Sequence, residues 1–278
     1  MMPKSQVSSL GVCYLDTTFL VGCLFLPKSE TKPYLDRIQK FSQTHIPEYA
    51  HKELKLGVVR NFHWFFTKLQ DTNSMVDALS ALQRSSLSLA RYRTATGIQA
   101  LKTAMNNSLT QLLLARQAGQ SSSDSNEKTL ARIMALELRR QITSGWNNRL
   151  AIGKMVFPLD CYPRQQIDSE SDPFTIKPDN CAKGAKCCVF KELKQYKKQA
   201  KILKDVISAL PPKQEYKRRK DALKQVQLGR EFDLKECRAI GDAYFALTCA
   251  KDWTLLSTNT KDFAPMAEAL KLKSEGLE

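Results

Sequence analysis

Residues 11–16 have the sequence GVCYLD, a short apolar run that ends in an acid. Such a run predicts a buried strand over 12–15, with Asp16 at its end, followed by a buried helix over 17–26. Residues 253–257, WTLLS, predict another short buried strand near the end of the chain. Because helical patterns separate the strands, the sequence favours an α/β fold with a short parallel sheet.

Hydrophobic periodicity predicts the remaining elements. A further strand is expected over 45–49. Helices are expected over 32–41, 53–66, 71–117, 127–150, 189–210, 213–228, 232–253 and 264–272. The helix at 71–117 should begin at Asp71 or Thr72 and break near Gly97 or Ser85. It should pack against 127–150 as an antiparallel hairpin, whereas 158–186 reads as irregular.

The positive charge of the chain lies in its middle. The 278 residues carry 43 Lys and Arg against 28 Asp and Glu, a net charge of +15. Residues 1–66 contribute +3 and residues 231–278 contribute −3, so 67–230 hold the whole excess. A charge of this size favours a polyanionic partner, most often nucleic acid. The composition excludes a disordered, collagen-like or polytopic membrane protein.

Several acids follow or flank the predicted strands. Asp16 ends the first strand, where parallel sheets bind their ligands, and Glu53 begins a helix after the second strand. Asp242 lies in the middle of an apolar predicted helix, where an isolated carboxylate is costly unless a cation accompanies it. Asn259 and Asp262 follow the last strand. Taken singly, each of these residues could instead be a helix cap, a solvated helix residue or one partner of a salt bridge.

Together these segments resemble the PIN-domain ribonucleases. The resemblance rests on VCYLDTT (12–18), YAHKELKLG (49–57), GDAYFALT (241–248) and LLSTNTKDF (255–263). It covers about 8–66 and 231–272, and it implies a PIN-like three-layer α/β fold interrupted by a mostly α-helical insertion. The expected domains are a discontinuous PIN-like nuclease domain, 1–66 with 231–278, and a basic helical insertion, 67–230, which contains an irregular, Cys-containing segment, 158–188.

The resemblance implies that Asp16, Glu53 and Asp242 bind one or two Mg²⁺ or Mn²⁺ ions. These hard ions prefer carboxylate oxygens, and they activate water for attack on a phosphodiester. Asn259 stands where many members of the family carry Asp, and Asp262 is the following acid. The expected catalytic acids are Asp16, Glu53, Asp242 and Asp262, with Asn259 as a further metal ligand.

The implied activity is metal-dependent endoribonucleolytic cleavage, with RNA as partner and DNA as the less favoured substrate. A toxin or defence role with an antitoxin or inhibitor protein is plausible, and PIN domains often form homodimers. The alternatives are a non-catalytic nucleic-acid-binding scaffold with a degenerate PIN fold and a flap-type DNA nuclease. A fourth interpretation makes the apolar stripe of 75–113 a docking face for a partner, although a buried hairpin core explains it more simply.

A dense basic segment follows the irregular one. Residues 183–224 hold 14 basic side chains against four acidic ones. This density favours phosphate contact over the alternative of a solvated helix face. The candidate nucleic-acid contacts are Lys194, Lys197, Lys198, Lys201, Lys217, Arg218, Arg219 and Lys220.

The eight cysteines fall into two groups. Cys13, Cys23, Cys237 and Cys249 lie in apolar stretches and are expected to be buried thiols. Cys161, Cys181, Cys187 and Cys188 could be free thiols, a disulfide or a structural Zn²⁺ site, although they lack the usual paired knuckles.

Two further expectations concern a histidine and the compartment. His51 is the histidine nearest the acids in sequence. The apolar run 10–26 is short for a membrane span and contains Asp16, so a cytoplasmic location without membrane contact is expected.

Overall fold

The computed structural model describes residues 10–26, 28–84, 110, 114, 126–161, 187–211 and 214–277. The strands are β1 (Leu10–Leu15), β2 (Phe41–Pro47), β3 (Lys154–Val156), β4 (Thr254–Leu256) and β5 (Lys273–Glu275). The first helices are α1 (Thr17–Phe25), α2 (Lys28–Ile38), α3 (Glu48–Leu54), η1 (Lys55–Val59), α4 (Arg60–Thr72), α5 (Met75–Arg84) and α8 (Asn126–Ile152). The later ones are α9 (Cys188–Leu193), η2 (Lys194–Tyr196), α10 (Lys197–Ala209), α11 (Gln214–Leu228), α12 (Leu234–Ala239), α13 (Asp242–Thr248) and α14 (Thr260–Leu270).

The strands form one parallel sheet, which confirms the predicted α/β class. Their order is β3-β2-β1-β4-β5, and every neighbouring pair is parallel. The chain moves outward from β1 through β2 to β3, then crosses to β4 and β5 on the other side of β1. The strand order therefore reverses between β1 and β4, and such reversals place a ligand crevice at the carboxyl ends of the two strands.

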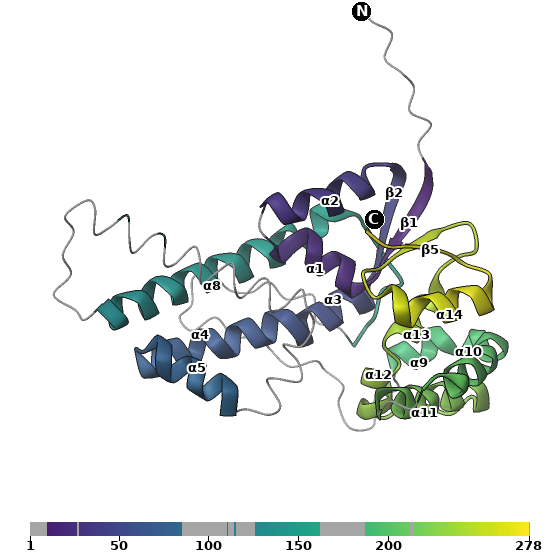
Figure 1. Cartoon of the computed structure of the whole chain (residues 1–278). Coiled ribbons are helices and arrows are strands. Elements are labelled where there is room, and N and C mark those ends of the chain that lie inside the picture. Colours follow the sequence, from purple (N-terminus) through teal and green to yellow (C-terminus); the bar gives the residue numbers. More distant parts are fainter. Residues whose placement is uncertain are drawn as a thin grey trace, which may run out of the picture.

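Helices lie on both sides of the strands. Connections between parallel strands are right-handed, so the helices between β1 and β3 should lie on one face and those between β3 and β5 on the other. Figure 1 agrees: α1, α4 and α8 lie on one side, and α10, α11 and α14 on the other. Both sets approach the carboxyl end of β1.

The first helical layer is built around aromatic side chains. Trp146 of α8 and Phe62 of α4 are fully buried, and the Phe25 and Phe62 rings meet edge-on at 6.0 Å. Gly145 gives this layer its close approach, since a Cβ there would lie 2.6 Å from Phe25 Cε1. Aromatic contacts of this kind account for much of the apolar area that a core buries.

A second aromatic group joins the sheet to α13. The Tyr49 ring stacks on Tyr244 with centroids 4.3 Å apart, and Tyr14 of β1 packs edge-on against Phe245 at 6.4 Å. The hydroxyls of Tyr14 and Thr248 share a 2.7 Å hydrogen bond, which satisfies both groups in the core. This packing fixes α13, and hence its first residue Asp242, against β1 and α3.

Two strands escaped the sequence analysis, and several boundaries were wrong. β3 and β5 are three residues long and lie at the two edges of the sheet, too short to show a pattern. β3 also lies within 67–230, so that segment contributes to the sheet as well as helices. α2 begins at Lys28, and Pro33 lies inside it instead of opening it. Phe41 begins β2 instead of ending a helix.

The helix predicted from Asp71 or Thr72 starts later. Asn73 has a left-handed backbone, φ 50°, and ends α4. Ser74 then accepts a 3.1 Å hydrogen bond from the Asp77 backbone N–H, as an N-cap residue does. The predicted stripe beyond residue 84 lies outside the described residues, apart from 110 and 114, which are helical. α4 runs continuously across residue 66, the predicted domain boundary.

The helices predicted at 232–253 and 189–210 are each broken. Gly241, with φ 43°, separates α12 from α13, so Asp242 begins a helix instead of lying in the middle of one. The tighter turn η2 separates α9 from α10, and α10 ends before Pro211 as predicted. α14 begins at Thr260, earlier than predicted, which puts Asp262 in its first turn. In the described part of the chain, no helix has the length and apolar character needed to cross a bilayer.

Candidate active site

Asp16 lies at the carboxyl end of the central strand and caps the helix that follows. Its Oδ1 accepts a 2.8 Å hydrogen bond from the Phe19 backbone N–H. The Ser257 hydroxyl donates to Oδ2 at 2.6 Å, and the Thr18 hydroxyl donates at 2.9 Å. The side chain is 1% exposed. Residues after β1 and after β4 therefore hold this carboxylate together, at the point where the strand order reverses.

Glu53 reaches the same region from α3. It lies near the end of that helix, not at the start of one as the sequence suggested. The Thr17 hydroxyl donates a 2.6 Å hydrogen bond to Glu53 Oε2. Because Thr17 directly follows Asp16, this contact brings the second acid beside the first.

Asp242 approaches from the opposite layer, at the first position of α13. Its Oδ2 lies 2.8 Å from an Nη of Arg219, and the two side chains are 18% and 9% exposed. Asn259 donates to the same oxygen at 3.3 Å. Gly241 precedes Asp242 with a left-handed φ of 43°, which a residue with a side chain rarely adopts. The cation that the sequence analysis required for Asp242 is therefore supplied by the protein.

Asn259 and Asp262 complete the group after β4. The Asn259 side-chain amide also donates to Asp262 Oδ2 at 3.2 Å. The Tyr216 hydroxyl donates to Asp262 Oδ1 at 2.7 Å. Asn259 thus bridges the two acids, so all five predicted site residues lie in one hydrogen-bonded or electrostatically coupled region.

The acids influence one another electrostatically. Burial raises the pKa of Asp16 to about 7 in spite of the hydrogen bond from Ser257, and the charge of Asp242 adds to the rise. Burial also raises the pKa of Glu53 to about 7, which the Thr17 hydrogen bond opposes and the charges of Asp242 and Asp16 reinforce. Like charges in a dry site disfavour simultaneous ionisation. Asp16 and Glu53 therefore keep their protons up to about pH 7 when no cation is bound.

The donor atoms suit a hard divalent cation, although they are not arranged around one. Carboxylate and amide oxygens are the ligands that Mg²⁺ and Mn²⁺ prefer. Within the described ranges, however, no three His, Cys, Asp or Glu side chains form a ready metal-binding group. Asp242 is engaged by Arg219, and Asp16 by hydroxyl donors. Asp16, Glu53 and Asp242 could hold a metal if Asp242 turned away from Arg219.

Two residues of this site were missed or misread. Arg219 was expected at a nucleic-acid surface, which is wrong: it is 8% exposed and paired with Asp242. Tyr216 was not considered. Both lie on α11, three residues apart, and therefore on one helix face. A Tyr and an Arg at helical spacing inside a basic segment are the signal that could have suggested an inward-facing stripe.

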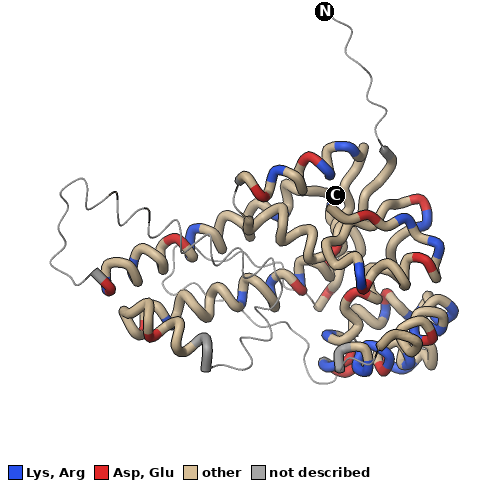
Figure 2. Tube along the Cα trace, viewed as in Figure 1, with Lys and Arg blue, Asp and Glu red and all other residues tan. Residues whose placement is uncertain are grey.

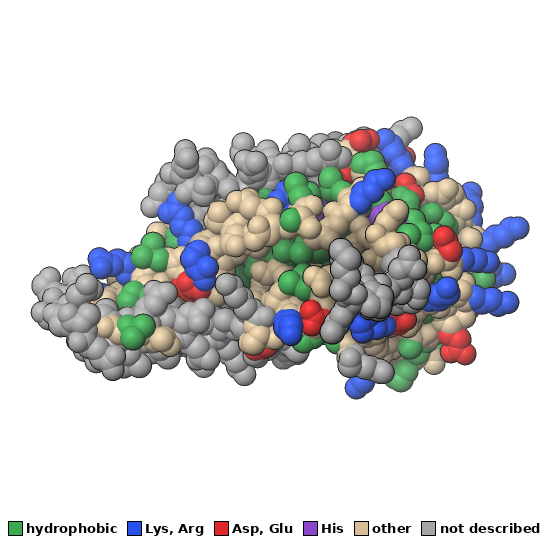
Figure 3. Space-filling model, turned by 90° about the horizontal axis from the view of Figure 1, so that it is seen from above, with side chains coloured by type: hydrophobic (Ala, Val, Ile, Leu, Met, Phe, Trp, Pro, Cys, Tyr) green, Lys and Arg blue, Asp and Glu red, His purple; other side chains and the backbone are tan. Residues whose placement is uncertain are grey.

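The other basic candidates remain at the surface of α10 and α11. Lys194, Lys197, Lys198, Lys201, Lys217 and Arg218 are exposed, and Lys220 is half-buried. Figure 2 shows Lys and Arg concentrated along these helices, and Figure 3 shows Lys and Arg side chains projecting from the end of the molecule where α10, α11 and α14 lie. A polyanion could contact this surface, although no base contact follows from it.

The predicted cysteine groups are divided differently in the structure. Cys13, Cys23, Cys237 and Cys249 are buried free thiols, as expected. Cys181 lies outside the described residues. Cys161 and Cys187 lie near Cys237, which the sequence analysis had placed in the other group. A hydrogen bond with Cys237, backbone N–H groups and the Lys52 ammonium lower the pKa of the Cys187 thiol to about 6.

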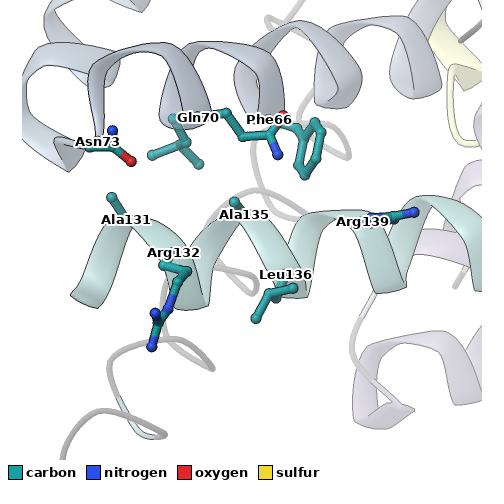
Figure 4. Close-up of a pocket in the computed structure, with 9 residues that line it drawn as sticks. Phe66, Gln70, Asn73, Ala131, Arg132, Ala135, Leu136 and Arg139 are labelled. Carbon is teal, nitrogen blue, oxygen red and sulfur yellow. The ribbon is translucent and has the colours of Figure 1, made fainter. Parts of the chain in front are cut away.

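His51 and the groove between α4 and α8 are separate from the acids. His51 is 1% exposed, and burial and the charge of Arg149 lower its pKa to about 4. The groove has a volume of about 310 Å³, and Gln70 and Arg139 are among its lining residues (Figure 4). None of the predicted site residues lines it. Its described lining residues include no Asp, Glu, His or Cys.

Comparison with known proteins adds no relationship to this geometry. No protein-family model, no curated protein and no solved structure matches the chain.

Proposed function

We propose that this protein is a metal-dependent endoribonuclease with a PIN-like fold. The observation that carries the proposal is the convergence of Asp16, Glu53 and Asp242 from β1, α3 and α13. They meet at the place where the sheet order reverses, and there burial, reinforced by the charges of neighbouring acids, raises the pKa of Asp16 and Glu53. Clustered carboxylates of this kind are typical of sites that bind divalent cations.

The site residues have distinct roles under this proposal. A bound Mg²⁺ or Mn²⁺ would supply Lewis-acid chemistry and a nucleophilic water. Asp16, Glu53 and Asp242 would hold the ion. Ser257 and Thr18 orient the Asp16 carboxylate by hydrogen bonds, as the partners of metal ligands commonly do. Asn259 and Asp262 would act next to the ion rather than replace one of the three acids.

The basic surface of α10 and α11 supports a nucleic-acid substrate. Its exposed Lys and Arg side chains lie on the two helices that also contact the acid site, through Arg219 and through the packing of α10 on α14. Electrostatic binding by such a surface depends on salt, because each phosphate contact releases counterions. RNA is proposed over DNA on the PIN resemblance alone. The toxin role, the inhibitor protein, the homodimer and the cytoplasmic location stay predictions.

The test is cleavage of labelled RNA and single-stranded DNA with Mg²⁺ or Mn²⁺. Wild type is compared with Asp16→Asn, Asp242→Asn and the exposed control Asp36→Asn. We expect RNA cleavage to fall about 100-fold or more in both site variants, in the range of losses for a key charge-stabilising group. The control should cut as wild type does. Equal cutting by all four proteins would refute the catalytic role of the acids.

Binding in the same samples separates the alternatives. If nothing cuts but RNA still binds, the non-catalytic scaffold is the better description. If DNA is the better substrate, the protein is a DNA nuclease. Replacing Lys197, Lys198 and Lys201 together by Glu should weaken RNA binding and reduce its salt slope by about 2. The same change at exposed Lys32 and Lys40 should leave the slope almost unchanged.

A further inference from the structure

Four distant segments of the chain bring sulfur and nitrogen atoms together outside the acid site. Lys52 comes from α3, Cys161 follows β3, Cys187 precedes α9 and Cys237 lies in α12. The Lys52 Nζ lies 3.6 Å from Cys161 Sγ and 3.8 Å from Cys237 Sγ. A hydrogen bond joins the thiols of Cys187 and Cys237. We call these four residues the thiol cluster.

Burial makes the thiol cluster chemically unusual. Lys52 and Cys237 are each 2% exposed and Cys161 is 8% exposed, whereas Cys187 is half-buried. An ammonium group close to sulfur in a dry environment favours the thiolate, which is the reactive form of cysteine. Among the cysteines of the thiol cluster, Cys187 is the one that a small reagent can reach most directly. Cys237 lies behind it as a second thiol within reach.

We propose that Cys187 and Cys237 are an oxidisable pair that a peroxide converts to a reversible disulfide. The proposal does not depend on the nuclease function. A structural metal is the competing use of such thiols, but the Lys52 ammonium would repel a divalent cation there. Moreover, no three metal-ligating side chains of the described residues form a metal-binding group. Positive charge beside paired thiols instead favours nucleophilic attack on an oxidant.

The reaction balances with the peroxide as the only co-reactant. The Cys187 thiolate attacks one oxygen of hydrogen peroxide, so an S–O bond forms, the O–O bond breaks and hydroxide leaves. The Cys237 sulfur then attacks the resulting sulfenic acid. The S–S bond forms, the S–O bond breaks, and the departing hydroxide takes the Cys237 proton as water. The two thiols together lose two electrons, which reduce the peroxide to water.

The test is a peptide map of the full-length protein after oxidation. Reduced protein is treated with hydrogen peroxide, the remaining thiols are blocked with N-ethylmaleimide, and peptides are analysed without reductant. We expect one linked peptide pair containing Cys187 and Cys237, which dithiothreitol separates. Cys187→Ser and Cys237→Ser should each abolish it. The matched control is Cys188→Ser, the adjacent half-buried cysteine, which should keep it.

The role of Lys52 has its own readout. Lys52→Met should slow disulfide formation at neutral pH about tenfold or more, because it lowers the thiolate fraction. Lys52→Arg retains the charge and should restore most of the rate. Circular dichroism of each variant identifies any that fail to fold. The peptide map of the wild-type protein tests the pairing by itself, even if a variant does not fold. A map in which Cys187 pairs with another cysteine or stays unpaired would overturn the proposal. So would stoichiometric zinc in the purified protein that Cys237→Ser releases.

Discussion

Asp16 is a carboxyl group whose ionisation opposes folding. Its ordinary pKa is 3.8, and burial raises the pKa in the folded protein to about 7. Between these values the folded chain keeps a proton that the unfolded chain has lost. The contribution of Asp16 to stability is therefore fully present below about pH 4 and is lost as the pH rises through 7. Glu53 acts in the same direction, from an ordinary value of 4.5.

We expect Asp16→Asn to remove much of this pH dependence. The variant also changes the hydrogen bonds from Ser257 and Thr18, which adds an offset that does not depend on pH. Relative to wild type, however, it should gain about 2–4 kcal/mol of unfolding free energy between pH 4 and pH 8 in metal-free buffer. Urea denaturation at several pH values measures the change. Exposed Asp36→Asn is the control, and a difference that is constant with pH would show that Asp16 is not buried in this way.

Arg219 and Asp242 provide a second test at the level of single residues. Removing one partner of a buried ion pair leaves an uncompensated charge, which costs about 3 kcal/mol or more. Arg219→Ala should therefore destabilise the protein strongly, whereas Arg219→Ala in an Asp242→Asn background should cost less. The coupling free energy from the double-mutant cycle, measured in urea, should exceed about 1.5 kcal/mol. As a control, Arg218→Ala at the neighbouring exposed position should change stability little. If the destabilisations of Arg219→Ala and Asp242→Asn simply add in the double variant, the two residues are not paired.

Among the elements, helices whose ends carry clear stop signals could be predicted, and the breaks could not. α8 and α11 match their predicted ranges closely because Gly153 and Gly229 directly follow them and Pro211 and Pro212 precede α11. Gly241 stopped a helix that local apolarity would have continued: its φ is positive, and its backbone N–H donates a 3.2 Å hydrogen bond to the distant Tyr49 hydroxyl. Edge strands of three residues, such as β3, take their conformation from the neighbouring strand rather than from their own sequence.

The packing of α8 on α1 depends on a residue without a side chain. A Cβ at Gly145 would lie 2.6 Å from Phe25 Cε1, closer than packed atoms allow. Gly145→Ala should therefore destabilise the protein by about 1–3 kcal/mol, and Phe25→Leu in the same chain should relieve part of the loss. The control is Gly57→Ala in η1, where a Cβ meets nothing within 4 Å. That change should be neutral or stabilising by up to about 1 kcal/mol, and urea denaturation of all variants compares them.

At the scale of the whole molecule, the acid site was more predictable than the way it is assembled. The five site residues were identified because they follow or flank the predicted strands and because their segments resemble those of PIN domains. The cost of a buried carboxylate argued only for Asp242. Their contact with α11 could not be foreseen, since charge and periodicity do not reveal which face of a basic helix points inward. Tyr216 and Arg219 reach Asp262 and Asp242 from within the segment expected to be a separate insertion.

This sharing of the site predicts that residues 67–230 cannot simply be removed. Their loss would remove α8, against which α1 and α4 pack with Phe25 and Phe62, and it would leave the outer edge of β2 without β3. It would also remove Arg219 from beside Asp242. We therefore expect 1–66 joined to 231–278 by a short Gly-Ser linker to lack the sharp, cooperative urea transition of the full chain, because too little apolar area remains buried.

Circular dichroism and proton NMR of the shortened and full chains make this comparison directly. Dispersed amide signals and a cooperative transition in the shortened chain would show instead that the discontinuous nuclease domain folds alone, as the sequence suggested. In that case the Arg219 contact would be an addition to a finished site. Loss of both signals would mean that the basic segment and the acid site fold as one unit, so the residues that neutralise the acids belong to the same core that positions them.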